Sequence, residues 1–229
     1  MFSSKNSKSK LLVLIALVLF PASIYLYFIV RLKNVPKLPY LGPREPVEMV
    51  VDGETIVDTL YHQVPDFSFQ AHNGKDIEEQ IMENKICVVD FFFASCQSIC
   101  PIMSNQLERV QKHYEEFDDL LLISHTVDPE SDSVSVLNKY AHHHNADEGK
   151  WLFVTGSKKE LYEIARKGYF VSASEGDGGE EDFIHSPMFV LVDKEKRLRG
   201  YYDGTDSTDV DRLIDDIRIL IGEYQLTLK

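Results

Sequence analysis

The sequence predicts a three-layer α/β fold, with a central mixed sheet between helices, preceded by one N-terminal transmembrane helix. Three observations support this. Between residues 86 and 167, apolar runs typical of buried strands alternate with helical patterns. A hairpin pattern at residues 188–202 then adds antiparallel strands to a parallel core. Near the N-terminus, Leu11 to Val30 is a run of 20 residues without a charge, and a helix of that length spans about 30 Å, the thickness of the hydrocarbon core.

The N-terminal run is expected to be a retained membrane anchor. A cleaved signal peptide is the alternative, but its apolar core is usually only about 7–15 residues and ends at a small-residue cleavage site. The run here is longer, and no clear site follows it. No cysteine lies in or just after it, so a lipoprotein anchor is unsupported. The absence of an Arg/Ser-rich transit peptide ahead of it favours a bacterial over a mitochondrial protein.

The chain is expected to divide into a cytoplasmic tail with the anchor (residues 1–33), a linker (34–59) and a globular domain (60–229). The linker contains four prolines, which exclude a helix and indicate an extended stalk. Those prolines are Pro36, Pro39, Pro43 and Pro46. Within the linker, Asp52-Gly53 separates two short β patterns at 48–51 and 55–58, which predicts a small hairpin.

The globular domain is expected to alternate strands and helices, with right-handed crossovers between its parallel strands. The predicted strands are 66–70, 86–93, 120–127, 151–155, 188–193 and 198–202. The predicted helices are 77–84, 101–117, 133–145, 157–167 and 207–221. Pro101 suits a first helical turn, where its missing N–H costs nothing. Ser157 is expected to cap the helix that follows it.

The composition excludes a largely disordered chain and argues against nucleic-acid binding. Apolar residues make up 44% of the sequence, and the net charge is −13, whereas a nucleic-acid binder needs a basic surface. The first 45 residues hold seven Lys/Arg and one Glu, which leaves 17 basic and 36 acidic residues, a balance of −19, in the rest. The two parts are therefore expected to face different surroundings.

Cys96 and Cys100 lie where a buried strand ends and a helix begins. Free N–H groups and the positive end of the helix dipole lower a thiol pKa there, and the thiolate is both a nucleophile and a soft metal ligand. Two thiolates suit Cu(I), whereas structural zinc usually takes four ligands. A plain disulfide or two core thiols is the alternative. Cys87 lies inside the apolar strand and is expected to be a packed core residue.

His185 is the most informative of the eight histidines. It follows an acidic, glycine-rich loop at 172–182 and precedes the strand at 188, in a turn expected to face the cysteines. A lone loop histidine is usually solvated, so spacing alone leaves its role open. The side chains of His142, His143 and His144 point in three directions around a helix end. They therefore cannot all bind one metal ion, and they are expected at the surface. His125 is expected to be a hydrogen-bonded interior histidine.

The ordered motifs resemble the Sco/SenC family over residues 60–225. They are Cys96-x3-Cys100-Pro101 after an apolar strand, Val127-Asp128-Pro129-Glu130 after the next, and a late histidine before a hairpin. The resemblance implies a thioredoxin-like fold and a copper metallochaperone in which Cys96, Cys100 and His185 bind Cu(I) or Cu(II). Implied partners are cytochrome c oxidase subunit II, or another copper acceptor, and a copper donor chaperone. The paired cysteines and the family together favour a single-pass protein of the bacterial inner membrane, with its soluble domain on the periplasmic, exported side.

Two departures keep a redox alternative open. Gln97 stands where the family often has proline, and Pro187 precedes a strand as in thiol-disulfide oxidoreductases, where a cis-proline faces the cysteine pair. In this alternative Cys96 attacks and Cys100 resolves, and the protein keeps the cysteines of the copper acceptor reduced. Copper binding requires His185, whereas exchange does not. A redox sensor or peroxidase, and an interaction module with a structural disulfide, are further alternatives.

Overall fold

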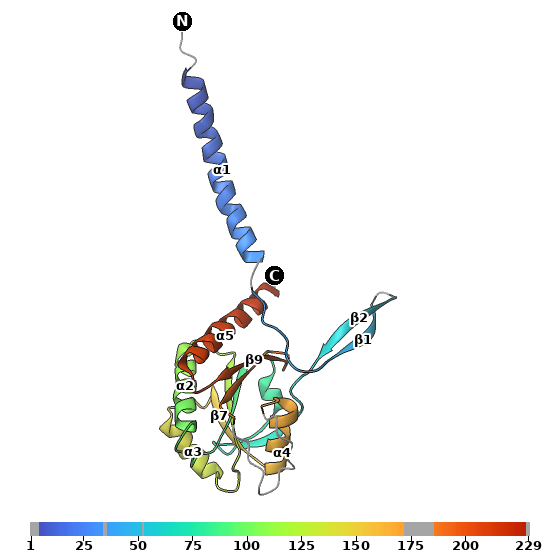
Figure 1. The fold of residues 1–229 in the computed structure, drawn as a ribbon, viewed down its shortest axis with the longest axis vertical. Coiled ribbons are helices and arrows are strands. Elements are labelled where there is room, and N and C mark those ends of the chain that lie inside the picture. The colour runs from blue at the N-terminus through green and yellow to red at the C-terminus, as the bar shows by residue number, and fades with distance from the viewer. Residues whose placement is uncertain (1–4, 34–35, 52, 172–185, 228–229) are drawn as a thin grey trace. The chain divides into compact units, whose positions relative to one another are not determined.

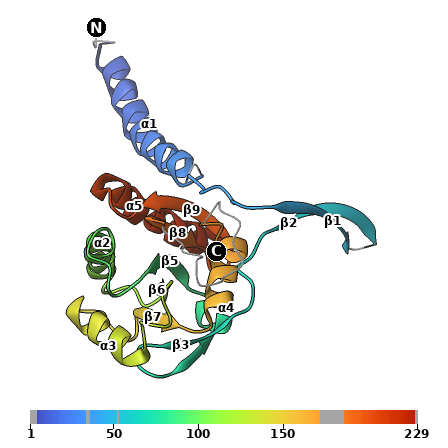
Figure 2. The same ribbon diagram turned by 60° about the horizontal axis from the view of Figure 1, so that its bottom comes forward.

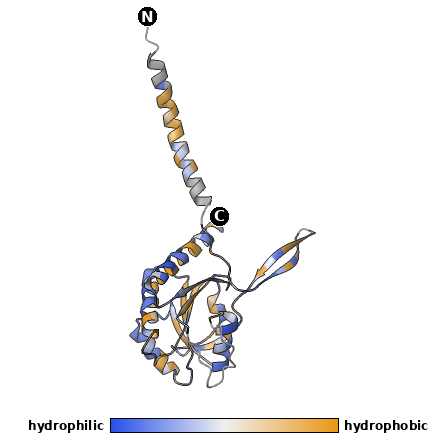
Figure 3. Cartoon of the chain, viewed as in Figure 1, coloured by the Kyte–Doolittle hydropathy of each residue, from blue (hydrophilic) through white to orange (hydrophobic). Residues whose placement is uncertain are grey.

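The computed structural model describes residues 5–33, 36–51, 53–171 and 186–227. The chain forms two compact units, Met1–Lys37 with Gly222–Lys229, and Leu38–Ile221. The smaller unit contains helix α1, Lys5–Lys33, part of which is hydrophobic (Figure 3). The apolar side chains described in this helix are exposed. The membrane span expected at residues 11–30 falls within α1. In the part of the chain that the structure describes, however, no helix combines the length and apolar character needed to cross a membrane.

The larger unit begins with a two-stranded hairpin that forms a sheet of its own (Figure 1). Strand β1, Arg44–Val51, pairs antiparallel with β2, Glu54–Tyr61. Gly53 has a φ of 84°, which favours glycine at this turn. The hairpin expected within the linker is confirmed, and it is longer than predicted.

Seven further strands form the central sheet, in the order β4-β3-β7-β6-β5-β8-β9. Strands β5, β6 and β7 are mutually parallel, and every other neighbouring pair is antiparallel. Their bounds are β3 Ser68–Ala71, β4 Asp76–Glu78, β5 Ile86–Phe92, β6 Leu120–Thr126, β7 Trp151–Thr155, β8 Met188–Val192 and β9 Leu198–Asp203. The predicted mixed sheet is therefore confirmed, and its parallel centre places the ends of β5 and β6 side by side.

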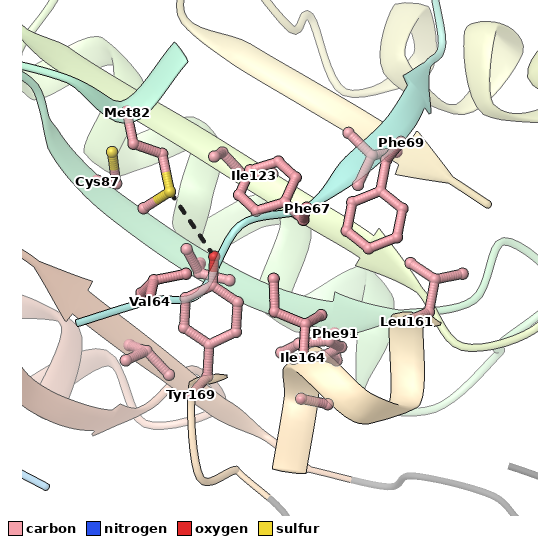
Figure 4. Close-up of a cluster of buried hydrophobic side chains, with 14 of the residues drawn as sticks. Val64, Phe67, Phe69, Met82, Cys87, Phe91, Ile123, Leu161, Ile164 and Tyr169 are labelled. Atoms are coloured by element: carbon pink, nitrogen blue, oxygen red, sulfur yellow. Dashed lines mark hydrogen bonds between the residues drawn. The ribbon is translucent and has the colours of Figure 1, made fainter. Parts of the chain in front are cut away.

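Helices cover both faces of the sheet, which gives three layers (Figure 2). On one face lie α2, Cys100–His113, α3, Val134–His143, and α5, Ser207–Thr227. On the other lie α4, Lys158–Glu163, and a π-helical turn, Ile164–Gly168. Alternate residues of β5 divide between two cores: Val88 and Phe92 face α2, while Cys87 and Phe91 face α4 (Figure 4).

Two predictions about helices have different outcomes, one at the cap of α4 and one at residues 77–84. The Ser157 hydroxyl accepts the N–H of Glu160 at 3.2 Å, so the predicted cap of α4 is confirmed. The helix predicted over 77–84 is wrong. That segment forms β4 and then a 3-10 turn, Glu79–Met82, because Ile77 pairs with Phe69 across the sheet and Met82 is buried in the core.

Candidate functional site

Both paired cysteines lie in the connection from β5 to α2. Strand β5 is buried along its whole length, and the loop that follows turns through a hydrogen bond from the Cys96 N–H to the Phe93 carbonyl at 3.2 Å. Cys100 is the first residue of α2. Cys96 is 8% exposed and Cys100 2%, and both are free thiols. The position predicted from the strand-to-helix junction is confirmed, and the two side chains interact with each other.

The N-terminus of α2 has no side-chain cap, and Cys96 lies in the loop just before it. Ile99 is the cap residue and makes no side-chain hydrogen bond, while Pro101 fills the first turn. The Cys96 sulfur lies 3.5 Å from the Ser98 hydroxyl oxygen, and the backbone at Ser98 and Cys100 favours its charged form and so lowers its pKa. The sulfur thus lies at the start of a helix, where the backbone and the helix dipole favour a negative charge.

The two thiols have opposite acidities. Burial by itself raises the pKa of Cys96, but hydrogen bonds from the Ser98 hydroxyl, the Cys100 thiol and the backbone lower it to about 7. Burial and the bond that Cys100 donates to Cys96 raise the pKa of Cys100 to about 12. Near neutral pH the pair therefore combines a substantial fraction of Cys96 thiolate with a protonated Cys100 that donates to it.

A buried carboxyl lies on the α2 face of β5, six residues before Cys96. Asp90 is 1% exposed, and burial raises its pKa to about 7 against the opposing hydrogen bond from Ser124. The Ser124 hydroxyl donates to Asp90 Oδ1 at 2.5 Å and accepts from Trp151 Nε1 at 2.9 Å. The charge of Asp90 contributes to the raised pKa of Cys100, so this buried chain is electrostatically coupled to the site.

Asp132 holds the cysteine loop to the end of β6, a role that the sequence did not reveal. Its Oδ2 accepts the Ala94 N–H at 3.0 Å and the Thr126 hydroxyl at 2.5 Å. Asp128, the residue that the motif had singled out, uses its backbone carbonyl to accept the Asp132 N–H at 2.9 Å. The available signal was a second aspartate four residues after Asp128, in a loop that follows a buried strand.

His185 lies outside the described residues, as does the loop 172–182. Among the residues that the structure does describe, no three His, Cys, Asp or Glu side chains come together to hold a metal ion. The described backbone contains no cis peptide bond, so the bond from Ser186 to Pro187 is trans.

The other histidines divide between surface and core. His142 and His143 are exposed, as expected, but the surface prediction is wrong for His144, which is 5% exposed because it packs against Tyr140. His125 is interior, as predicted, yet neither ring nitrogen has a hydrogen-bond partner among the described residues. Its ring stacks on Phe91 with centroids 5.0 Å apart, and burial lowers its pKa to about 3, so it is neutral.

Cys87 is a core residue, as predicted. It is fully buried in the cluster that also holds Met82 and Tyr169 (Figure 4). Burial raises the pKa of its thiol far above the usual value. Cys87 therefore provides an internal reference: a thiol of the same protein that is neither ionised nor accessible.

Comparison with known proteins identifies the family. The family model described as SCO1/SenC matches residues 58–222. The chain belongs to the SCO1/SenC family. The SCO1 protein homolog of Bacillus subtilis is 32% identical over 168 residues, which cover 72% of this chain and 86% of that relative. The resemblance inferred from the cysteine motif is thus confirmed.

Solved Sco structures share the fold. BsSco is described as a member of the Sco family of cytochrome c oxidase assembly proteins with a disulfide switch; it is 30% identical, with a TM-score of 0.60, over 69% of this chain and 93% of that one. Arabidopsis thaliana ScoI, solved with copper bound, is 26% identical, with a TM-score of 0.54, over 67% of this chain and 97% of that one. The structural neighbours of this Sco/SenC chain therefore include a protein that holds copper.

The rate at which iodoacetamide alkylates Cys96 in this family member is expected to reach half of its maximum near pH 7. Only the thiolate reacts, so the rate rises as the pH is raised through the Cys96 pKa of about 7. Ser98→Ala removes a hydrogen bond to the sulfur and is expected to move the midpoint to higher pH. Ser95→Ala, at an exposed neighbouring serine, is the matched control. A midpoint near about 8.5, the value of an ordinary thiol, would contradict the hydrogen-bonding account.

Proposed function

We propose that this chain is a copper metallochaperone whose cargo is held by Cys96, Cys100 and His185. The observation that carries the proposal is the convergence of two sulfur atoms at the N-terminus of α2, one of them favoured as a thiolate. Thiolates are the soft donors that Cu(I) prefers, and an imidazole nitrogen also suits Cu(II). The donor set therefore fits copper in both oxidation states, with His185 as the nitrogen ligand.

The proposed acceptor is the copper site of cytochrome c oxidase subunit II, and the proposed source is a copper donor chaperone. Family membership supports this assignment, because BsSco is described among cytochrome c oxidase assembly proteins. A site with few ligands favours transfer, since an incoming sulfur or nitrogen can displace one ligand at a time. Both proposed partners therefore exchange copper with the β5–α2 end of the domain.

Tethering is a separate part of the proposal. We infer that residues 11–30 anchor the chain in a bacterial inner membrane, that 34–59 form the linker, and that 60–229 lie on the exported side. The support is the uncharged run of 20 residues. Alkaline extraction of membranes tests the anchor, and protease treatment of intact spheroplasts tests on which side of the membrane the domain lies. Release of the protein by alkali would overturn the anchor, and protection of the domain from protease would overturn its placement on the exported side.

Copper titration of the reduced full-length protein, with and without His185→Ala, tests the metal site. We expect one tightly bound copper per chain, with a Cu(II)–thiolate absorption band and an EPR signal that His185→Ala abolishes. His113→Ala, at an exposed histidine on α2, is the matched control and is expected to change neither. Weak copper binding, or a Cu(II) spectrum that survives His185→Ala, would overturn the three-ligand site.

A second candidate function is thiol-disulfide exchange, which one observation favours specifically. The pKa of Cys96 is about 7 and that of Cys100 about 12, so one thiol is ready to attack and its neighbour is positioned to resolve. In this function the protein would reduce the cysteines of the copper acceptor. Exchange does not need His185. Equal rates of disulfide reduction in the parent protein and His185→Ala, together with weak copper binding, would favour this function over the first.

A further inference from the structure

A pocket of about 470 Å³ opens beside Cys96, between the start of α2 and the C-terminal half of α3. Its volume falls within the range of small-molecule sites, about 300–1,000 Å³. Cys96 and Asn105 line one side, and Lys139, His143 and His144 belong to the side formed by α3 and its end. Cys100 does not line the pocket and is 2% exposed, so Cys96 is the thiol that a bound molecule would meet.

Apart from the Cys96 thiol itself, the side chains that line this pocket carry a charge of opposite sign to that of the chain. Among the described residues that line it there is no carboxylate, and Lys139 contributes an exposed ammonium group. The chain as a whole carries −13. Asn105 and His143 add side-chain hydrogen-bond donors. Glu108 acts on His144 electrostatically and accepts the Asn145 amide at 2.9 Å, but it does not line the pocket.

A larger pocket elsewhere in the domain has a lining of the opposite charge. It has a volume of about 670 Å³, is lined by residues of β3, β4 and α4, and has five carboxylates and one lysine, Lys167, in its lining. The carboxylates are those of Asp66, Glu78, Glu79, Glu160 and Glu163. In a chain this acidic, a pocket that combines a cysteine with a lysine and no acidic side chain is suited to a ligand of negative charge.

We propose that the pocket bounded by Cys96 and Lys139 binds a small anionic disulfide and that Cys96 is the residue such a compound modifies. The carboxylates of the ligand would lie toward Lys139, Asn105 and His143, with one sulfur of its disulfide toward Cys96. This inference extends the exchange function proposed above, and it requires neither copper nor His185.

The reaction balances without a further reagent. The Cys96 sulfur attacks one sulfur of the bound compound, the S–S bond of the compound breaks, and a mixed disulfide forms on Cys96. The other half leaves as a thiol, with the proton that Cys96 gave up. Cys100 then attacks the Cys96 sulfur, releases the second half with its own proton, and leaves a Cys96–Cys100 disulfide. The cysteine pair loses two electrons, and the compound gains them.

The test compares three disulfides of different charge on the reduced, metal-free full-length protein: glutathione disulfide (anionic), 2-hydroxyethyl disulfide (neutral) and cystamine (cationic). Mass spectrometry follows the mixed disulfide, which Cys100→Ser traps on Cys96. Rates are divided by those for a small free thiol, which removes the intrinsic reactivity of each reagent. The net charge of −13 alone predicts that cystamine reacts fastest. The proposed pocket predicts that glutathione disulfide reacts fastest, by about two- to fivefold over the neutral compound.

Two variants test whether the preference for glutathione disulfide arises in the pocket. Lys139→Glu is expected to abolish or reverse the preference for glutathione disulfide. Lys159→Glu, at an exposed lysine on α4 and the opposite face of the sheet, is the matched control and is expected to leave it unchanged. S-methylglutathione, which cannot exchange, should slow iodoacetamide labelling of Cys96 in a saturable manner. This protection needs no variant, so it keeps the test valid if Lys139→Glu does not fold.

Different experimental results would overturn the pocket proposal and the exchange function. If Cys96 reacts with all three disulfides in the order set by net charge, and S-methylglutathione gives no protection, the pocket proposal is overturned and exchange stands. If Cys96 forms a mixed disulfide with none of them, exchange itself fails, and this proposal fails with it. Equal effects of Lys139→Glu and Lys159→Glu would also overturn the pocket, because the preference would then reflect net charge.

Discussion

Replacing Cys100 with serine is expected to weaken Cu(I) binding by more than about 100-fold. Loss of a residue that merely supports a metal ligand already costs about 10- to 100-fold in affinity, so loss of a proposed ligand should exceed this range. A hydroxyl is a hard donor that Cu(I) disfavours, while its size fits the site that the buried Cys100 occupies. Competition with a chromogenic Cu(I) chelator, under anaerobic reducing conditions, measures the change.

Cys87→Ser is the matched control for that experiment. Cys87 is also buried and also a free thiol, but it lies in the other core, on the α4 face of the sheet. The control is expected to keep its Cu(I) affinity within about twofold, although the buried hydroxyl lowers its stability by about 1–3 kcal/mol. Equal losses in the two variants would mean that Cys100 acts through the fold and not as a ligand.

Arg199→Met is expected to lower the free energy of unfolding by about 3–5 kcal/mol, because it removes the more deeply buried of the two guanidinium partners of a buried carboxylate, Asp193. Arg199 and Asp193 have side chains that are 1% and 0% exposed, and Nη1 lies 3.0 Å from Oδ2. The same guanidinium donates to the carbonyls of Pro39, at 3.1 Å, and Leu38, at 2.8 Å. The substitution therefore also releases the chain segment that precedes the hairpin. Urea unfolding followed by circular dichroism measures the loss.

Two further variants separate the ion pair from simple packing. Arg197→Met removes a second partner of Asp193, but its side chain is 22% exposed, so we expect a smaller loss. Combining Arg199→Met with Asp193→Asn removes the buried charge that Arg199→Met leaves with Arg197 as its remaining guanidinium partner, and should recover part of the stability lost in Arg199→Met alone. An additive loss in the double variant would contradict the charge explanation.

The sequence predicted those features that depend on local pattern. The apolar run in β5 and the junction before Pro101 located the cysteine pair, because a buried strand followed by a helix start is a local signal. Long-range contacts determined the rest. Ile77 forms a strand because Phe69 lies opposite it, and His144 is buried because Tyr140 and Trp151 pack against it. No spacing rule contains that information.

The polar contacts of the site were equally inaccessible to sequence. Asp132 reaches Ala94 across 38 positions of the chain, and the pocket beside Cys96 exists because α3 packs against the start of α2. Hydrogen-bond partners at such separations depend on the register of β5 against β6, which pairs Phe92 with Thr126. A one-residue slip in this register would turn these side chains to the other face.

The chain from Asp90 through Ser124 to Trp151 also provides a spectroscopic reporter. Trp151 is the single tryptophan of the sequence and is fully buried, so the long-wavelength ultraviolet emission of the protein comes from one indole in one environment. Its N–H is hydrogen-bonded to the hydroxyl that donates to Asp90, and Asp90 acts electrostatically on Cys100. Metal loading or oxidation of the cysteine pair should therefore change the emission intensity, and the state of the site can be followed in real time without an added dye.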